Sequence, residues 1–376
     1  MKKIICLLLV FLSFPFIPIS AKGLSVPSIS AKAAVVINGI TREVIYSKNM
    51  DQKLSMASTT KIMTSLLLIE SGLLDEEYTV TKEAIVEGSS IGLKAGDVIT
   101  GKNLLAGMML ESGNDAATAT AIWLSGSTKA FAQKMNQKAK EIGMQNTNFV
   151  TPSGLDSDEH YSTAFDMAIL TAAALEVKEF REISSTVSMS ATYGTPPEKH
   201  NFYNHQKLLT EYDGAIGVKT GYTRKSGRCL VSAAERDGKL IIVVTLSDPN
   251  DWEDHKALLD YGMSEVECCD ITYKGGDIEV SVVGSDISLV SLAVPKRMAG
   301  LSEEEKKHIT YKIETEGFQY APTVAGQVAG KVYYYYKGNL IATDNLYIGG
   351  DTPFSNTADP DNNFWRSFRL IFSFFK

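Results

Sequence analysis

The order of extended and helical runs along the chain constrains its fold more than any other feature of the sequence. Two β-type runs near the start, Ala33–Ile37 and Glu43–Tyr46, flank an Asn38-Gly39 pair that favours a hairpin turn. Three more come much later, at Gly217–Tyr222, Cys229–Ala234 and Leu240–Leu246. A long segment of helical pattern separates the two groups. The early and late strands are therefore expected to share one sheet in an α/β domain.

The segment between these strands is predicted to form several consecutive helices. Apolar residues recur at helical spacing over residues 58–70, and Ser58 is expected to open that helix. The stretch Gly101–Met144 is rich in Ala, Leu and Met and is punctuated by glycines. A capping-box pattern at Thr163–Asp166 opens a further helix. Asp251–Tyr261 is predicted as the helix that closes the domain.

Beyond about residue 263 the pattern changes. Short β-rich runs with turns between them predict a second, all-β domain over residues 264–351. The runs are Ile278–Val283, Ile287–Ala293, Ile309–Ile313 and Val328–Tyr336. This part of the sequence carries no convincing catalytic grouping, so residues 32–262 are expected to form the catalytic domain.

Both ends of the chain have the character of targeting or membrane-contacting segments. Two lysines, an apolar run and then small residues predict a secretory signal peptide over residues 1–21, with an N-terminal anchor helix as the alternative. Over residues 360–376, aromatic and basic residues fall on opposite sides of a helix. That pattern predicts an amphipathic helix in a membrane interface, the alternative being a helix docked on its own protein. The protein is therefore expected outside the cytoplasmic membrane, anchored peripherally on its outer face.

Charge and cysteine content argue against several classes of function. The net charge is −7 and no long Lys/Arg run lies in the interior, so no nucleic-acid partner is expected. Beyond the predicted signal peptide the cysteines are Cys229, Cys268 and Cys269, an odd number of which two are adjacent. Neither they nor the five histidines have the spacing of zinc ligands. Neither a disulfide framework nor a metal or other cofactor is expected.

Three short motifs follow one another along the predicted catalytic domain. Ser58-Thr-Thr-Lys61 matches Ser-x-x-Lys at a predicted helix start, and Ser112-Gly-Asn114 matches Ser-x-Asn between helices. Lys219-Thr220-Gly221 is a Lys-Thr-Gly motif on a predicted strand. The first two patterns also occur elsewhere in this chain, at Ser373-Phe-Phe-Lys376 and Ser47-Lys-Asn49. The order and setting of all three therefore carry the information.

The chemistry of these residues is consistent with nucleophilic catalysis. An i, i+3 spacing stacks Ser58 and Lys61 on one helical face, which brings the hydroxyl and the amine within possible reach of one another. Lysine can act as a base only if burial or a neighbouring cation lowers its pKa, and Lys219 could be that cation. A position near a helix N-terminus would also present backbone N–H groups to a developing oxyanion. Alone, Lys61 would be read as a solvated helix lysine.

A second serine must be weighed as nucleophile. Gly88-Ser-Ser90-Ile-Gly92 matches Gly-x-Ser-x-Gly, the nucleophile elbow of α/β-hydrolases. That motif needs a strand before it and a helix after it. Residues 81–87 are not a clear strand, and the residues after Gly92 have the pattern of a turn. The elbow is therefore the weaker hypothesis.

Together the three motifs resemble those of serine penicillin-recognising enzymes. Further stretches are similar to low-molecular-mass penicillin-binding proteins, the serine D-alanyl-D-alanine carboxypeptidases, and the resemblance covers roughly residues 33–263 in detail. The stretches are Met56–Lys61, Glu111–Ala117, Ser153–Asp156, Tyr161–Ala164 with Asp166-Met167, and Gly217–Thr223. The resemblance implies a penicillin-binding or β-lactamase-like α/β domain, an antiparallel sheet flanked by helices plus a helical subregion, followed by a small all-β domain. A signal peptide and a C-terminal anchor also fit that family.

The resemblance implies roles for individual residues. Ser58 would attack the carbonyl between the two terminal D-alanines of a peptidoglycan stem peptide, with Lys61 as general base. Ser112 would relay a proton to the leaving amine, and Asn114 would orient the substrate amide. On the Lys-Thr-Gly strand, Lys219, Thr220 and Gly221 would bind the substrate, and Lys219 and Thr220 would hold its terminal carboxylate. The backbone N–H groups of Ser58 and Tyr222 would form the oxyanion hole. Many relatives have His where Tyr222 stands, which predicts a change in rate or preference.

Two alternatives stay open. A class A β-lactamase shares the first and third motifs, but it has Asp where Gly113 stands and needs a downstream Glu that activates the deacylating water. No Glu-x-x-Leu-Asn follows Ser112, so β-lactams are expected to act as inhibitors that acylate the protein. The other alternative is an inactive relative that binds the wall or acts as a membrane scaffold; the intact Ser58, Lys61 and Lys219 argue against it.

Overall fold

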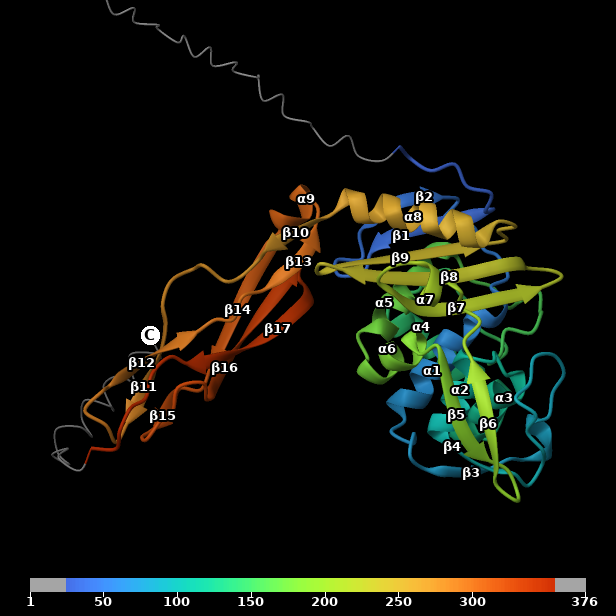
Figure 1. The fold of residues 1–376 in the computed structure, drawn as a ribbon, viewed down its shortest axis with the longest axis horizontal. Coiled ribbons are helices and arrows are strands. Elements are labelled where there is room, and N and C mark those ends of the chain that lie inside the picture. The colour runs from blue at the N-terminus through green and yellow to red at the C-terminus, as the bar shows by residue number, and fades with distance from the viewer. Residues whose placement is uncertain (1–24, 356–376) are drawn as a thin grey trace, which may run out of the picture.

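The computed structural model describes residues 25–355. The predicted signal peptide and the predicted amphipathic helix, at 1–21 and 360–376, lie outside these residues. Two lobes are visible in Figure 1: a larger one of sheet and helices, and an elongated one of strands that extends away from it. No helix among residues 25–355 combines the length and apolar character needed to cross a bilayer.

A five-stranded antiparallel sheet forms the centre of the larger lobe. Its order is β2-β1-β9-β8-β7, which confirms that strands from the start of the chain share a sheet with strands from much later. The strands are β1 Ala33–Asn38, β2 Val44–Lys48, β7 Ala215–Thr223, β8 Gly227–Arg236 and β9 Lys239–Leu246. The Lys-Thr-Gly motif therefore lies on an edge strand, where its outer side is open to a ligand.

Helices cover both faces of this sheet (Figure 1). Successive strand residues point to opposite faces, so Val243 packs in the cluster under α8 while Val244 packs in the larger core with the other helices. The helices are α1 Lys61–Glu70, α2 Gly101–Met109, α3 Asn114–Ser125, α4 Thr128–Glu141, α5 Ala164–Leu175, α6 Lys178–Ser185, α7 Leu208–Glu211 and α8 Asp251–Glu265. Two 3-10 turns, η1 Ala57–Thr60 and η2 Lys82–Ala84, accompany them. The small hairpins pair β3 Glu77–Thr79 with β4 Val98–Thr100, and β5 Ser188–Tyr193 with β6 Glu198–Tyr203.

The elongated lobe is the predicted all-β domain. A six-stranded sheet of order β14-β16-β17-β12-β11-β15 builds most of it, and a two-stranded pair of β10 and β13 lies next to the larger lobe (Figure 1). The elements are β10 Glu267–Asp270, β11 Ile278–Val283, β12 Leu289–Ala293, β13 Met298–Leu301, α9 Glu303–Lys306, β14 Ile309–Thr315, β15 Phe318–Tyr320, β16 Val328–Tyr336 and β17 Asn339–Ile348. Its own apolar core includes Val332, Tyr334 and Leu346. The fold class predicted from the sequence is therefore confirmed.

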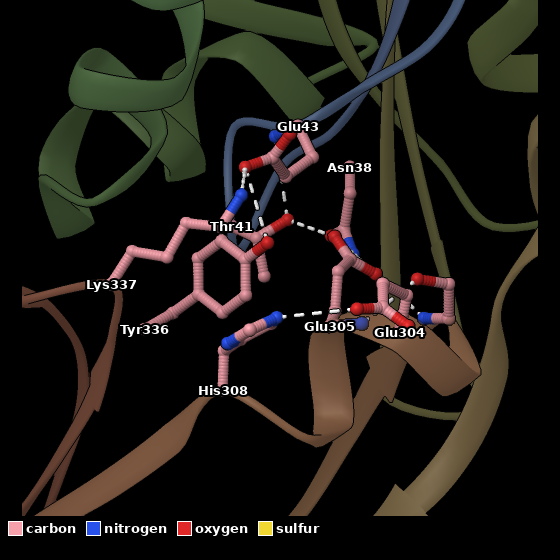
Figure 2. A network of polar contacts seen from close by, with 9 residues as sticks. Asn38, Thr41, Glu43, Glu304, Glu305, His308, Tyr336 and Lys337 are labelled. Carbon is pink, nitrogen blue, oxygen red and sulfur yellow. Dashed lines mark hydrogen bonds and ion pairs between the residues drawn. The ribbon is translucent and has the colours of Figure 1, made fainter.

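A polar network joins the two lobes (Figure 2). From the β lobe, the buried carboxylate of Glu305 accepts hydrogen bonds from Asn38 Nδ2 at 3.0 Å and from the Thr41 hydroxyl. Lys337 Nζ and the Tyr336 hydroxyl both donate to Glu43 Oε1, at 2.7 and 3.1 Å. All the partners in the larger lobe come from the end of β1 and the turn that follows it.

Several elements differ from the sequence prediction. The helix expected to begin at Ser58 begins at Lys61, because residues 57–60 form a tighter 3-10 turn whose first residue, Ala57, has φ 48°. The run expected to start at Ile287 starts at Leu289. The β5–β6 hairpin and β17 were not predicted, because polar residues interrupt the apolar pattern in each of them.

Candidate active site

Ser58 and Lys61 meet at the junction of η1 and α1. Ser58 lies within the 3-10 turn and is half-buried, whereas Lys61 is the first residue of α1 and is fully buried. Lys61 Nζ lies 2.9 Å from Ser58 Oγ. The i, i+3 spacing thus brings the hydroxyl and the amine together as the sequence predicted, although the turn between them is 3-10 rather than α.

Two further oxygens surround the Lys61 amine. Nζ donates to Asn114 Oδ1 and to the Ser153 carbonyl, each at 2.8 Å. The orientation of the Asn114 amide is set by its other end, because Nδ2 donates to the Glu87 carbonyl at 2.9 Å. The Ser-x-x-Lys and Ser-x-Asn motifs therefore meet through a direct side-chain contact.

These contacts suit a neutral amine. Burial lowers the pKa of Lys61 well below the usual lysine value, the nearby Lys219 lowers that pKa further, and Asp115 opposes the shift. A neutral amine has two N–H donors and one lone pair. The two fixed carbonyl-type oxygens take the donors, so the lone pair is left to accept the Ser58 hydroxyl proton. That is the arrangement of a base poised to activate a serine.

Lys219 supplies a second buried amine on β7. Its side chain is 1% exposed, and Nζ donates to the Thr220 carbonyl at 3.1 Å. Burial lowers its pKa to about 7. Lys219 thus influences Lys61 electrostatically from the neighbouring strand, as the sequence suggested.

Ser58 opens into a pocket of about 320 Å³ at the edge of the sheet. Its lining combines predicted site residues with others that no motif indicated: Ser58, Ser89, Ser112, His205, Thr220, Gly221, Tyr222, Arg228, Asp251 and Trp252. Ser112 is held at φ 59° between α2 and α3. Lys61, Asn114 and Lys219 are buried side chains outside this lining. The structure therefore gathers the three motifs around one cavity.

Gly221 allows β7 to approach the Ser58 turn closely. A Cβ at this position would lie 3.0 Å from the Ser58 backbone nitrogen and 3.1 Å from the Met56 carbonyl. Any side chain would therefore push the strand away from the nucleophile. Tyr222, the next residue, is 66% exposed, so its phenol extends into solvent at the mouth of the pocket.

The loop that carries Ser153 is fitted tightly against the same turn. Gly154 has φ 87°, and a Cβ there would lie only 1.9 Å from the Ala57 carbonyl oxygen. Below it, the Val150 N–H donates to His160 Nδ1 at 2.9 Å, which places the imidazole proton on Nε2, 2.8 Å from Thr60 Oγ1. No sequence pattern indicated His160, because its partners are a backbone group and a hydroxyl distant in the chain.

The rival serine has a structural role. Within residues 80–97 no strand precedes Ser90 and no α-helix follows it. Its hydroxyl donates to Asp115 Oδ2 at 2.6 Å, and the Asp115 carboxylate also accepts the N–H groups of Ile91, Gly92 and Leu93. Ser90 therefore helps to fix a loop, and the elbow hypothesis is wrong.

Two families match the two lobes. The family described as D-alanyl-D-alanine carboxypeptidase matches residues 20–250, and the family described as penicillin-binding protein 5, C-terminal domain, matches residues 271–353. The D-alanyl-D-alanine carboxypeptidase DacF of Bacillus subtilis is 32% identical over 89% of this chain and 89% of its own. The carboxypeptidase DacC of Escherichia coli is 30% identical over 90% of each chain.

Solved structures agree with these matches. Penicillin-binding protein 5 from Haemophilus influenzae superposes with a TM-score of 0.63 at 28% identity, over 88% of this chain and 100% of the other. The Streptomyces K15 DD-transpeptidase superposes with a TM-score of 0.61 at 35% identity, over 64% of this chain and 99% of the other. The first likeness spans both lobes, since it covers most of the chain.

Proposed function

This chain belongs to the D-alanyl-D-alanine carboxypeptidase family and is a serine peptidase of the penicillin-binding type; from that premise we propose that Ser58 is its nucleophile and Lys61 its general base. The enzyme removes the terminal D-alanine from peptidoglycan pentapeptide stems and is acylated by β-lactams. The observation that best supports the residue assignment is the 2.9 Å contact between Lys61 Nζ and Ser58 Oγ, with the two amine protons directed to other oxygens.

The acylation step follows from this geometry. The Lys61 lone pair takes the Ser58 proton as Oγ bonds to the carbonyl carbon of the penultimate D-alanine. The backbone N–H groups of Ser58 and Tyr222 stabilise the negative oxygen, which the close packing of Gly221 on the Ser58 turn supports. The C–N bond then breaks, and the leaving amine receives a proton through Ser112, which lines the same pocket.

Deacylation returns the enzyme to its starting state. Water attacks the ester, its proton passes to Lys61, and Ser58 leaves with a proton restored to its oxygen. The peptide is released one D-alanine shorter, which limits cross-linking because a donor stem needs that terminal bond. A class A β-lactamase role is disfavoured by Gly113, which stands where that class has Asp. We therefore expect penicillin to remain attached to Ser58 for long periods.

The central experiment compares two serine variants. D-Alanine release from a pentapeptide ending in D-Ala-D-Ala is measured for the wild type, Ser58→Ala and Ser90→Ala. We expect only Ser58→Ala to abolish release and labelling by fluorescent penicillin. Retention of both by Ser58→Ala would contradict the assignment, and rapid penicillin turnover by the wild type would favour the β-lactamase alternative.

We also propose that the protein is exported through residues 1–21 and attached to the outer face of the cytoplasmic membrane through residues 360–376. The described chain ends on the β lobe at its end remote from the catalytic lobe (Figure 1). The same lobe carries exposed apolar side chains, including Tyr320, Val324 and Phe354. Such an attachment would keep the catalytic lobe clear of the lipid, and a role in cell shape would follow from trimming wall precursors there.

Membrane attachment can be tested separately from catalysis. The mature chain and a version that ends at Ser355 are sedimented with vesicles of phosphatidylglycerol and phosphatidylethanolamine. We expect the full chain to pellet and the shortened one to stay in solution, with equal D-alanine release from both. Equal sedimentation of the two proteins would contradict the anchor.

A further inference from the structure

Two buried carboxyl groups face one serine at the N-terminal end of α8. Asp248 is fully buried in the loop between β9 and α8, and Asp254, in the first turn of α8, is 7% exposed. Ser30 Oγ lies 2.8 Å from Asp248 Oδ1 and 2.9 Å from Asp254 Oδ2. The Ser30 N–H also donates to Asp254 Oδ2, at 2.6 Å. The segment before β1 therefore meets the start of α8 through this acid pair, Asp248 and Asp254.

The contact has too few protons if both acids are ionised. A serine hydroxyl has one proton, so it can donate to only one of the two acid oxygens beside it. The other oxygen would then face Ser30 Oγ at hydrogen-bond distance with no proton between them. One added proton completes the chain, because the Asp248 carboxyl then donates to Ser30 Oγ while the Ser30 hydroxyl donates to the Asp254 carboxylate. The geometry thus fits one neutral acid and one carboxylate.

The surroundings place the added proton on Asp248. Its Oδ2 is buried and accepts no hydrogen bond from the residues that the structure describes. An unpaired buried oxygen costs far less free energy on a neutral acid than on a carboxylate. Burial raises the pKa of Asp248 to about 6; the Ser30 hydrogen bond opposes this shift, and the charge of Asp254 adds to it. Burial also acts to raise the pKa of Asp254, but the hydrogen bonds from Ser30 outweigh burial and lower that pKa.

Other ionisable groups surround the acid pair on three neighbouring elements. They are Asp251 and His255 on α8, Arg228 and Cys229 on β8, and Tyr46 and Lys48 on β2. Burial lowers the pKa of His255 to about 3, raises that of Cys229 to about 11 and raises that of Tyr46, so these three keep their charge state between pH 5 and 8. Arg228 is permanently charged and is paired with Asp251. A transition near pH 6 in this region therefore reports the acid pair.

The same contact connects the N-terminal segment with the wall of the catalytic pocket. Ile29 packs in the apolar cluster under α8, and Ser30 is exposed, which gives protons from the medium a route to the acid pair. On the other side, Asp248 Oδ1 accepts the Asn250 N–H at 3.2 Å and so shapes the loop before α8. The two residues that follow Asn250 both line the catalytic pocket.

We propose that Ser30, Asp248 and Asp254 form a proton-operated latch, which holds the N-terminal segment and the loop before α8 in place in an acidic medium and loosens as the pH rises above neutrality. When the shared proton is lost, Asp248 becomes a buried carboxylate with an unpaired oxygen beside a second negative charge. Hydration of that charge requires the loop or the segment to move outward. The latch goes beyond the proposed function, since it makes one wall of the catalytic pocket responsive to the acidity of the medium.

Hydrogen exchange measured by mass spectrometry tests the latch in the mature chain. Peptides covering residues 25–36 and 246–254 are followed at pH 5 and pH 8, with correction for the intrinsic pH dependence of amide exchange. A carboxyl pKa of about 6 in the closed latch and about 4 in water lowers the closed-to-open ratio about tenfold between these two pH values. We expect the protection of both segments in the wild type to fall by about that factor. Equal protection at pH 5 and pH 8 would overturn the proposal.

The variant Asp248→Asn separates the shared proton from other effects of pH. An asparagine amide donates to Ser30 Oγ as the protonated acid does, and it does not ionise. We expect Asp248→Asn to keep the pH 5 level of protection at both pH values. The matched control is Asp237→Asn, in the exposed turn between β8 and β9, which should show the wild-type fall.

Two further readouts decide between the possible outcomes. A fall in protection of wild-type size in Asp248→Asn would overturn the latch, because this variant has no carboxyl group to ionise at that position. Labelling of Ser58 by fluorescent penicillin is expected in the wild type and in both variants. It reports whether each protein is folded, and it separates failure of the latch from failure of the proposed function.

Discussion

Lys61 occupies a position that favours the neutral form of its amine over the charged form. Its side chain is fully buried, and the charge of Lys219 disfavours a second cation nearby. The contacts with Asn114 and Ser153 then decide where the remaining lone pair points. Burial thus keeps the amine unprotonated and able to act as a base at neutral pH. The hydrogen bonds orient its lone pair. Neither would suffice alone, because a solvated lysine is protonated and a mobile one is not aimed at the hydroxyl.

The pH dependence of acylation should report this arrangement. The pKa of Lys61 is lowered, so the reactive neutral form is lost as the pH falls through that value, and acylation should slow. Replacing Lys219 by Met removes the neighbouring charge, which should raise the pKa of Lys61 and move the profile to higher pH. The measurement is the second-order rate of Ser58 acylation by a penicillin between pH 5 and 10. An unshifted profile in Lys219→Met would contradict the coupling.

At the scale of elements, the site depends on a loop packed against a turn. Gly154 contacts the Ala57 carbonyl so closely that even a methyl group would have to displace one of the two backbones. Gly154→Ala should therefore move Ser153 away from Lys61 and lower the acylation rate by at least about tenfold, the effect of losing roughly 1.4 kcal/mol. Gly143→Ala is a suitable control, since it shares a positive φ but nothing lies within 4 Å of the added carbon. Similar losses in both variants would point to backbone strain instead of displacement.

His255 joins α8 to the sheet and should make stability depend on pH. It is fully buried, and its ring nitrogens lie 2.6 Å from Ser232 Oγ and 2.9 Å from Thr245 Oγ1. Burial lowers its pKa to about 3, below the unfolded value of about 6.5. The stabilisation is therefore complete above pH 6.5 and is lost as the pH falls from there towards 3. By pH 4 the loss from this residue should be on the order of 3 kcal/mol.

The contribution of His255 can be isolated by substitution. The free energy of unfolding is measured by denaturant titration at several pH values for the wild type and for His255→Gln. The variant is expected to be less stable at pH 8 but to lose less on acidification. Parallel curves for the two proteins would show that another group, such as the buried His160, causes the acid sensitivity.

How far the sequence could predict these elements depended on whether a local pattern existed. The strands of the central sheet and the residues Ser58, Lys61, Ser112 and Asn114 could be predicted, because apolar runs and short motifs encode them locally. Arg228 and Asp251 could not, because they meet only when the first residue of α8 comes to lie beside β8. The 3-10 form of the Ser58 turn could not be predicted either, because it accompanies contacts with a loop distant in sequence.

At the scale of the whole molecule, the junction between the lobes should be sensitive to single changes. Asn38 is fully buried and donates to both Glu305 and the Gly300 carbonyl. Asn38→Ala leaves these buried acceptors short of a donor, which costs about 1–3 kcal/mol. We expect a lower unfolding temperature of the β lobe and faster proteolysis between the lobes, with D-alanine release unchanged. Calorimetry and limited trypsin digestion measure both, and an equal loss of catalytic activity would contradict this division of roles.

The attachment of the β lobe to the turn after β1 has a consequence for where the enzyme can work. The junction holds the lobes together through several buried or paired side chains, as Figure 2 shows. We therefore expect the β lobe to act as a rigid spacer. If residues 360–376 attach the chain to a bilayer as proposed, the length of the β lobe would fix the height of Ser58 above the lipid. With that attachment, only peptide stems within a thin layer at that height would be trimmed, and a longer or shorter β lobe would select a different layer.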